Sequence, residues 1–172
     1  DEKFDLQVKQ GHRVWGVDMK IVDDEENPQV HDGKARGHLV VRGPWITSGY
    51  YNNHDANEKA FTQDGWFYTG DIATIDPDSF LQLVDRSKDV IKSGGEWISS
   101  IDLENEAVGA PGVSEAAVIG VAHPKWDERP VLIIVPDDAD NPPSEDSIRE
   151  FLSTRIAKWW MPDMIAFKNE IP

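Results

Sequence analysis

The spacing of apolar residues changes partway along the chain, and this change limits the folds that the chain can adopt. From residue 13 to about residue 84, short runs such as Val17-Asp18-Met19-Lys20-Ile21 alternate apolar and polar residues, as strands with one buried face do. Turn signals separate these runs at Asp32-Gly33, at Asp64-Gly65 and at residues 76–79. We therefore expect this half to be mostly β structure, arranged as a small barrel or a meander.

The second half mixes helical and strand patterns. A helix is expected from Ile101 to about Val108, because Ser99 or Ser100 can cap it and acidic residues fill its first turn. A second helix is expected to begin after Ser144 and to end at Pro162. Apolar runs predict buried strands, and the segments concerned are residues 113–121, 131–135 and 164–167, with a polar loop at residues 123–129.

A charged stretch, Asp85-Arg86-Ser87-Lys88-Asp89, lies between the two halves and is a candidate hinge. A chain of 172 residues can hold two small domains. The predicted fold class is therefore α+β, with a small barrel-like β-rich subdomain over residues 1–85. A small α+β domain is expected to follow over residues 86–172, joined to the first by the hinge.

Composition excludes several classes of function. The 32 acidic and 17 basic residues give a formal charge of −15, which repels nucleic acid and anionic bilayers but does not exclude small anionic ligands held by local donors. The absence of cysteine excludes disulfides, zinc-thiolate sites and thiol nucleophiles. The five histidines lack metal-ligand spacing, so no metal site is predicted. No run reaches the roughly 20 apolar residues of a membrane span, and a cytoplasmic protein is expected.

Two segments place charged residues beside glycines. In residues 65–71, Asp71 follows Gly70, and in residues 85–96, Arg86 is the second residue of the charged stretch. A carboxylate can accept two hydrogen bonds from a ribose diol, and the planar guanidinium group of an arginine can hold the same sugar or a phosphate. Asp71 and Arg86 could therefore act together on a nucleotide, although a surface ion pair with turn glycines is the alternative interpretation.

Lys92 and Trp126 are weaker candidates. Lys92 precedes Ser93-Gly94-Gly95, where flexible backbone allows close approach of a ligand and the ammonium group could meet a phosphate or carboxylate. A solvated surface lysine is the alternative. Trp126 lies in the polar loop, where an exposed indole could stack on an adenine ring, or could simply pack within the loop. Trp159 and Trp160 are interpreted as packing residues.

Taken in order, these segments resemble the adenylate-forming superfamily, which includes acyl-CoA synthetases, luciferases and the adenylation domains of peptide synthetases. The resemblance extends from about Gly11 to Pro172. Its motifs are Gly37-His38-Leu39-Val40-Val41-Arg42-Gly43-Pro44, Gly49-Tyr50-Tyr51, Thr69-Gly70-Asp71, the 85–89 hinge segment and Lys92-Ser93-Gly94-Gly95-Glu96. The 92–99 stretch and the loop at residues 123–126 look most like medium-chain fatty-acid CoA ligases.

The resemblance implies a role for each candidate residue. Asp71 would bind the ribose hydroxyls of ATP or of the acyl-adenylate, and Arg86 the ribose or the phosphates. Lys88 would be the position about which the C-terminal domain swings between two half-reactions. The implied reaction joins a carboxylate and Mg-ATP into acyl-adenylate and pyrophosphate, after which the thiol of coenzyme A displaces AMP.

The thioester half-reaction involves the later motifs. Lys92 would support this step, Gly94 and Gly95 would make room for the pantetheine arm, and Trp126 would lie against the adenine of coenzyme A. The implied substrates and cofactors are therefore ATP, Mg²⁺, coenzyme A and a fatty or related carboxylic acid. The oligomeric state, a homo-oligomer included, is left open.

The chain departs from the family pattern at several positions. His38 stands where the pattern has Glu, Asp78-Ser79 where a Gly usually completes the turn, and Asp127 where a Gly usually precedes Glu128. In the family a Thr-x-x-Gly-Lys segment with the adenylation lysine follows the sequence represented here by residues 170–172. The chain is therefore expected to be a fragment of a longer enzyme and inactive alone.

Two alternatives compete with an acyl-CoA synthetase. An adenylation domain that loads a carrier protein would usually be followed by a carrier sequence, and none is present. A non-catalytic acidic interaction module would be marked by the loss of Asp71 or Arg86, and both are present.

Overall fold

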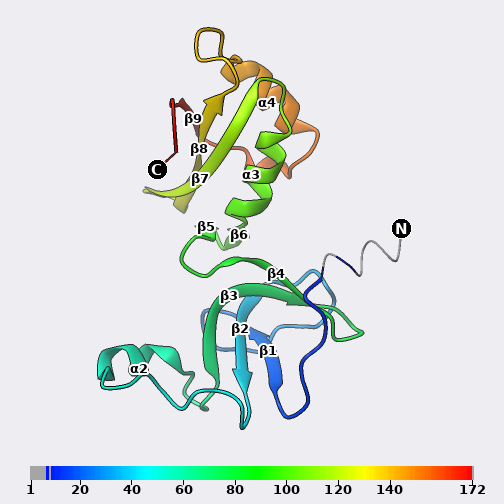
Figure 1. Cartoon of the computed structure of the whole chain (residues 1–172), viewed down its shortest axis with the longest axis vertical. Helices are drawn as coiled ribbons and strands as arrows, with labels where there is room; N and C mark the ends of the chain where they lie inside the picture. Colours follow the sequence, from blue (N-terminus) through cyan, green and yellow to red (C-terminus); the bar gives the residue numbers. More distant parts are fainter. Residues whose placement is uncertain (1–6, 8, 172) are drawn as a thin grey trace. The chain divides into compact units, whose positions relative to one another are not determined.

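The computed structural model describes residue 7 and residues 9–171, and the chain divides into two compact units at Lys88 and Asp89. Figure 1 shows the elements of each unit. The first unit contains β1 (Asp18–Val22), β2 (Gly37–Arg42), α2 (His54–Ala60), β3 (Phe67–Ile75) and β4 (Leu81–Arg86). The second contains β5 (Ile91–Ser93), β6 (Glu96–Ile98), α3 (Ser100–Val108), β7 (Val113–His123), β8 (Asp127–Pro136), α4 (Glu145–Ser153), the 3₁₀ turn η1 (Lys158–Trp160) and β9 (Met164–Phe167).

The first unit is built on a four-stranded antiparallel sheet in the order β1-β2-β3-β4. Because each strand pairs with its neighbour in sequence, the described strands form an open meander, and the barrel-like arrangement expected as one alternative is not formed. Successive side chains of a strand point to opposite faces, so Ile21 and Val22 of β1 belong to different buried clusters. Both faces of this sheet therefore carry core residues.

The helix α2 was not expected from the sequence. Asn53 caps it, since its side-chain oxygen accepts a hydrogen bond from the Ala56 N–H at 3.1 Å. Only Ala60 of this helix is buried. A short helix with so small an apolar face lacks the periodicity by which helices are recognised in sequence.

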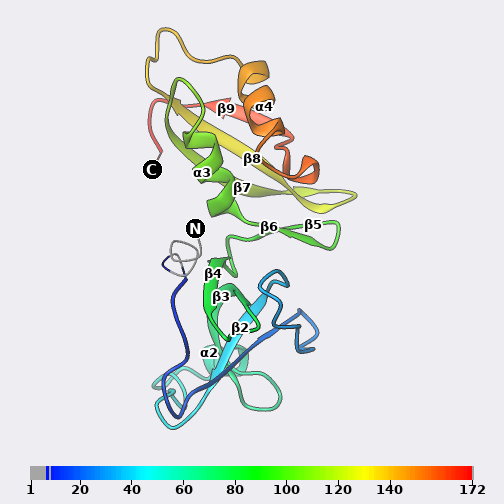
Figure 2. The same ribbon diagram turned by 90° about the vertical axis from the view of Figure 1, so that its right-hand side faces the viewer.

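The second unit is an α+β layer structure. Its sheet has the order β6-β5-β8-β7, and β9 pairs with β8 in parallel. Figure 2 shows the two helices lying along this sheet. The helices and alternate residues of the strands bury one common cluster, which includes Leu103 of α3, Leu152 of α4, Leu132 of β8 and Ile165 of β9. The α+β class predicted for this half is thus observed.

The helix starts in this unit follow their predicted caps, but one helix end does not. Ser99 accepts the Asp102 N–H at 3.1 Å and Ser144 the Ser147 N–H at 3.2 Å. Helix α4 ends at Ser153 and does not reach Pro162 as expected. Beyond this end, the Ile156 N–H still donates to the Leu152 carbonyl. Apolar residues therefore keep a helical spacing in the sequence past the last residue of the helix.

The polar loop predicted at residues 123–129 is mostly strand. Strands β7 and β8 pair as far as His123 and Asp127, which leaves only residues 124–126 in the turn. The side chains beyond the core are polar because this end of the hairpin is largely exposed, and polarity was mistaken for a loop. Every helix in the described part of the chain is too short or too polar to cross a lipid bilayer.

Candidate functional site

The candidate nucleotide-binding pair lies on two neighbouring strands of the first unit. Asp71 of β3 and Arg86 of β4 are register partners, and Arg86 Nη1 lies 3.2 Å from Asp71 Oδ1. The Arg86 side chain is 62% exposed and that of Asp71 is 21% exposed. A carboxylate and a guanidinium group therefore lie side by side and remain open to a ligand.

The local backbone explains how Asp71 is presented. Gly70 has a φ of +83°, a conformation that glycine adopts without steric cost. The Thr69 hydroxyl accepts the Asp71 N–H and donates to the Leu39 carbonyl, both at 3.2 Å. The Thr-Gly-Asp sequence thus forms a fixed bend, with the threonine attached to the adjacent strand β2 and the carboxylate directed by the bend.

The end of the first unit is attached to the same bend. The Ser87 N–H donates to the Gly70 carbonyl at 2.9 Å, and residues 87–89 form a turn in which Lys88 is exposed. His38 bridges two groups, since its Nδ1 lies 3.1 Å from Ser87 Oγ and its Nε2 lies 3.0 Å from Asp24 Oδ1. From the sequence, His38 was noted only as a departure from the family pattern, and its contact with Ser87, beside the candidate hinge, was missed.

In the second unit, β5 and β6 form a hairpin around the two glycines. Lys92 pairs with Trp97, and Ser93 pairs with Glu96. Gly94 and Gly95 have φ values of +60° and +86°, the pair of positive values that a two-residue type I′ turn requires. Lys92 is fixed through its backbone, whose N–H donates to Glu128 Oε2 at 3.0 Å.

Gly94 also packs too closely for a side chain. A Cβ atom there would lie 2.9 Å from Trp126 Cε3 and 3.1 Å from Trp159 Cζ2. The Gly94 N–H donates to the Trp126 carbonyl at 2.9 Å. Glycine is therefore required at this position both by its backbone conformation and by the close approach of two indole rings.

Trp126 is half-buried, which lies between the exposed indole and the packing within the loop that the sequence allowed. Its ring meets Trp159 edge to face, with centroids 5.0 Å apart, and Lys125 Nζ lies 4.3 Å from its centroid. An open groove of about 480 Å³ lies beside them and is lined by Glu96, Trp126, Ala157, Trp159 and Trp160. Trp159 had been interpreted as packing alone, because nothing in the sequence connects residue 126 to residue 159.

Tyr68, on the same strand as Asp71, has a shifted pKa. Burial, together with the nearby Glu26 carboxylate, raises the pKa of Tyr68 to about 12. The Tyr68 hydroxyl donates to Glu26 Oε1 at 3.2 Å. Tyr68 is therefore a neutral phenol at physiological pH and acts at the start of β3 as a hydrogen-bond donor.

No group of three or more His, Asp or Glu side chains within the described residues is arranged to hold a metal ion. The site groups are instead a carboxylate, cations, aromatic faces and a glycine turn. The charged pair of the first unit suits hydroxyls and phosphates, and the aromatic faces of the second unit suit a flat ring.

Two family models and several curated proteins match this chain. The family model described as AMP-binding enzyme matches residues 1–51, and the one described as AMP-binding enzyme C-terminal domain matches residues 102–172. Over the whole chain, 3-methylmercaptopropionyl-CoA ligase of Ruegeria lacuscaerulensis is 50% identical, the long-chain-fatty-acid–CoA ligase of Thermus thermophilus 47%, and the medium-chain-fatty-acid–CoA ligase of Ectopseudomonas oleovorans 43%. The chain spans about a third of each, 31%, 32% and 31% respectively.

A solved structure gives the same result for the fold. The o-succinylbenzoate CoA synthetase of Bacillus subtilis, in complex with the acyl-adenylate intermediate OSB-AMP, matches with a TM-score of 0.82 at 29% identity. The match covers 99% of this chain and 34% of that one.

Proposed function

Because this chain belongs to the AMP-binding enzyme family, we propose that it is the C-terminal part of an ATP-dependent acyl-CoA synthetase. The whole enzyme would join a carboxylate to ATP with release of pyrophosphate, and then transfer the acyl group from AMP to the thiol of coenzyme A. The relatives are acyl-CoA ligases about three times as long as this chain, so the rest of the active site would lie outside it.

The observation that carries this proposal is the Asp71–Arg86 pair. The pair presents two carboxylate oxygens and a planar set of donors on adjacent strands. In our proposal Asp71 accepts hydrogen bonds from the ribose hydroxyls, and Arg86 donates to the ribose or to the phosphates. A surface ion pair alone would not need the fixed bend at Gly70.

In our proposal, residues of the second unit act in the half-reaction that forms the thioester. We assign Lys92 to the support of this step, Gly94 and Gly95 to the passage of the pantetheine arm, and Trp126 to the adenine of coenzyme A. The groove beside Trp126 and the cation above its ring support this assignment. The domains we propose are residues 1–85 and residues 86–172, with Lys88 as the hinge between the two half-reactions.

The acid is proposed to be a fatty acid or a related small hydrophobic acid, since the named relatives act on 3-methylmercaptopropionate and on medium-chain and long-chain fatty acids. ATP would enter as its Mg²⁺ complex. We place the enzyme in the cytoplasm.

The test replaces each of the two charged side chains with a neutral one, in the full-length enzyme that contains this chain. Asp71→Asn and Arg86→Gln are expected to lower kcat/KM for ATP by roughly tenfold to a hundredfold each, because hydrogen bonds to charged groups contribute about 1.5–3 kcal/mol. Acid-dependent exchange of pyrophosphate into ATP measures this step. The matched control is Asp18→Asn, which breaks an exposed ion pair with Arg13 in the same unit and is expected to leave the exchange unchanged.

The products decide between the alternatives. Acyl-CoA and AMP formed from a panel of acids of increasing chain length would identify the substrate and support the proposal. Adenylate formation without acyl-CoA would favour an enzyme that loads a carrier protein. An enzyme whose exchange activity is the same in Asp71→Asn and the wild type would overturn the nucleotide-binding assignment.

A further inference from the structure

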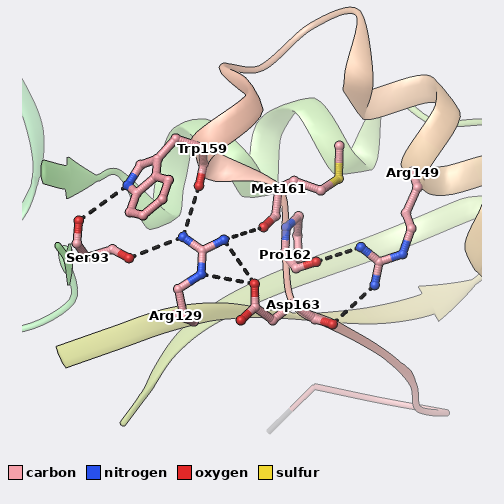
Figure 3. Close-up of polar contacts among 7 residues, drawn as sticks. All are labelled: Ser93, Arg129, Arg149, Trp159, Met161, Pro162 and Asp163. Carbon is pink, nitrogen blue, oxygen red and sulfur yellow. Dashed lines mark hydrogen bonds and ion pairs between the residues drawn. The ribbon is translucent and has the colours of Figure 1, made fainter. Parts of the chain in front are cut away.

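Arg129 is a buried cation in the second unit that the proposed function does not use. It lies on β8, its residue is 9% exposed, and its guanidinium group is drawn in Figure 3 at the centre of a set of polar contacts. A buried charge destabilises a fold unless hydrogen bonds and an opposite charge compensate for the loss of water. The partners of Arg129 therefore indicate its role.

All three nitrogens of the guanidinium group donate hydrogen bonds. Nε and Nη2 each lie 2.9 Å from Asp163 Oδ1. Nη1 donates to Ser93 Oγ at 3.2 Å and to the Trp159 carbonyl at 3.0 Å, and Nη2 also donates to the Met161 carbonyl at 3.0 Å. Four of the five N–H groups that an arginine carries thus donate hydrogen bonds, and these contacts fix the orientation of the side chain.

These acceptors come from two separate segments of the chain. Ser93, which is fully buried, precedes Gly94 in the β5–β6 hairpin. Trp159 and Met161 belong to the segment at η1 that forms one wall of the groove. The indole Nε1 of Trp159 also donates to the Ser93 carbonyl at 3.3 Å. Arg129 and Trp159 thus attach Ser93, which precedes the glycine turn, to the segment at η1, and Figure 3 shows these contacts among Ser93, Arg129 and Trp159.

Only an arginine-like fork can make these contacts together. A lysine would keep the charge, but its three donors radiate from one atom and could not reach Ser93, Met161 and Asp163 at once. An apolar side chain could fill the same volume and would often be no less stable. The geometry of the turn, more than the stability of the fold, therefore accounts for a buried arginine here.

We propose that Arg129 is a positioning residue for the transfer of the acyl group to coenzyme A. It holds the turn of Lys92, Gly94 and Gly95 packed against Trp159, and so fixes the position of the turn along which the thiol-bearing arm would pass. This inference rests on the proposed function, since it concerns the second half-reaction of that enzyme. It assigns no contact between Arg129 and a substrate.

The experiment separates the half-reactions in the full-length enzyme. Arg129→Lys is expected to slow acyl-CoA formation from preformed acyl-adenylate and coenzyme A by roughly tenfold to a hundredfold, since small misplacements can cost a hundredfold. The rate of acid-dependent pyrophosphate exchange is expected to stay within about twofold of the wild type, because the proposed nucleotide-binding residues Asp71 and Arg86 belong to the first unit. A structural defect alone would lower both rates together, and that result would overturn the inference.

Arg149 offers a matched control in the same region. It donates to the carbonyls of Pro162 and Asp163 at 2.6 and 3.3 Å, and it contacts neither Ser93 nor Trp159 in Figure 3. Arg149→Lys is expected to leave the ratio of the two rates at the wild-type value. An Arg149 variant with the same selective loss as Arg129→Lys would show that any disturbance of this loop suffices, and would overturn the specific role of Arg129.

A second variant covers the case in which Arg129→Lys does not fold. Ser93→Ala removes one acceptor and keeps the side-chain volume nearly unchanged, so it is expected to slow the same half-reaction by a smaller factor, about threefold to tenfold. Unchanged transfer in Ser93→Ala would overturn the inference. If the wild-type enzyme forms no acyl-CoA at all, the proposed function itself fails, and this outcome is distinct from any result with the variants.

Discussion

Ser79 takes a backbone conformation that residues with a Cβ atom rarely adopt, with a φ of +69° in the turn between β3 and β4. The left-handed region costs such residues about 1–2 kcal/mol. A glycine avoids this cost, but it loses more conformational entropy on folding, which cancels part of the gain. We therefore expect Ser79→Gly to stabilise the first unit by about 0.5–1 kcal/mol. In thermal unfolding of the chain, the midpoint temperature of the first unit should rise by roughly 2–6 °C.

The control for this prediction is a serine without a positive φ. Ser48 is exposed in the same unit and is not among the described residues with positive φ. There a glycine gains no relief of strain and only increases the freedom of the unfolded chain, so Ser48→Gly should destabilise by about 0.4–1 kcal/mol. Shifts of the same sign in both variants would contradict the strain argument.

At the scale of single residues, sequence reasoning reached contacts between near neighbours. Asp71 and Arg86 were considered together because their groups could bind the same sugar, and the β3–β4 hairpin makes them register partners. The departures at Ser79 and Asp127, where the family pattern has glycine, both lie at positive φ. Arg129 and Trp159 are 30 residues apart in the sequence but form a hydrogen bond, and no local sequence pattern predicts this contact.

At the scale of elements, helix starts were predictable because a cap is a local event. Ser99 and Ser144 each accept an N–H three residues ahead, and the sequence shows both residues of each pair. The end of α4 and the length of the β7–β8 hairpin depend on other forces. Ile156, Trp159 and Trp160 leave the helix to pack on the common core, and the polar residues near His123 are strand because an antiparallel partner strand is present.

The turn between β3 and β4 is expected to make this sheet sensitive to acid. Asp76 accepts from Lys9 Nζ at 2.5 Å and from the Phe80 N–H at 2.9 Å. The hydrogen bond from Lys9, and then that from Phe80, hold the pKa of Asp76 below its model-compound value of 3.8. A lowered pKa in the folded state stabilises the fold above the unfolded value, and this stability is lost as the pH falls through the folded pKa.

Asp76→Asn should therefore be less stable than the wild type at pH 7, and the difference should shrink and vanish as the pH falls below about 3.8. Urea unfolding at a series of pH values measures it. Lys9→Met, which keeps Asp76 and removes its first partner, should reproduce most of the effect. A stability difference that is constant from neutral to strongly acidic pH would show that the turn depends on shape and not on the charge of Asp76.

At the scale of the whole molecule, the chain consists of two units with separate cores. One is centred on Ile21 and Ile75, and the other on Leu103 and Leu132. The sequence predicts the domain boundary after residue 85, within the charged stretch 85–89, whereas the two compact units of the structure meet between Lys88 and Asp89. A switch from regular alternation to mixed periodicity is visible in sequence, because each unit buries its own apolar residues and leaves the connecting segment polar.

The proposed hinge at Lys88 yields the last prediction. Proline fixes φ near −65° and restricts the residue before it, so Lys88→Pro would restrict rotation at the turn of residues 87–89. We expect it to lower overall acyl-CoA formation by roughly tenfold or more while acid-dependent pyrophosphate exchange changes by less than about threefold, because only the full cycle needs both arrangements. Lys88→Ala is the matched control, since it removes the same charge but leaves the backbone free, and it should behave as the wild type. Equal losses in the proline and alanine variants would assign the effect to the lysine charge, and unchanged activity in both would remove Lys88 from the mechanism.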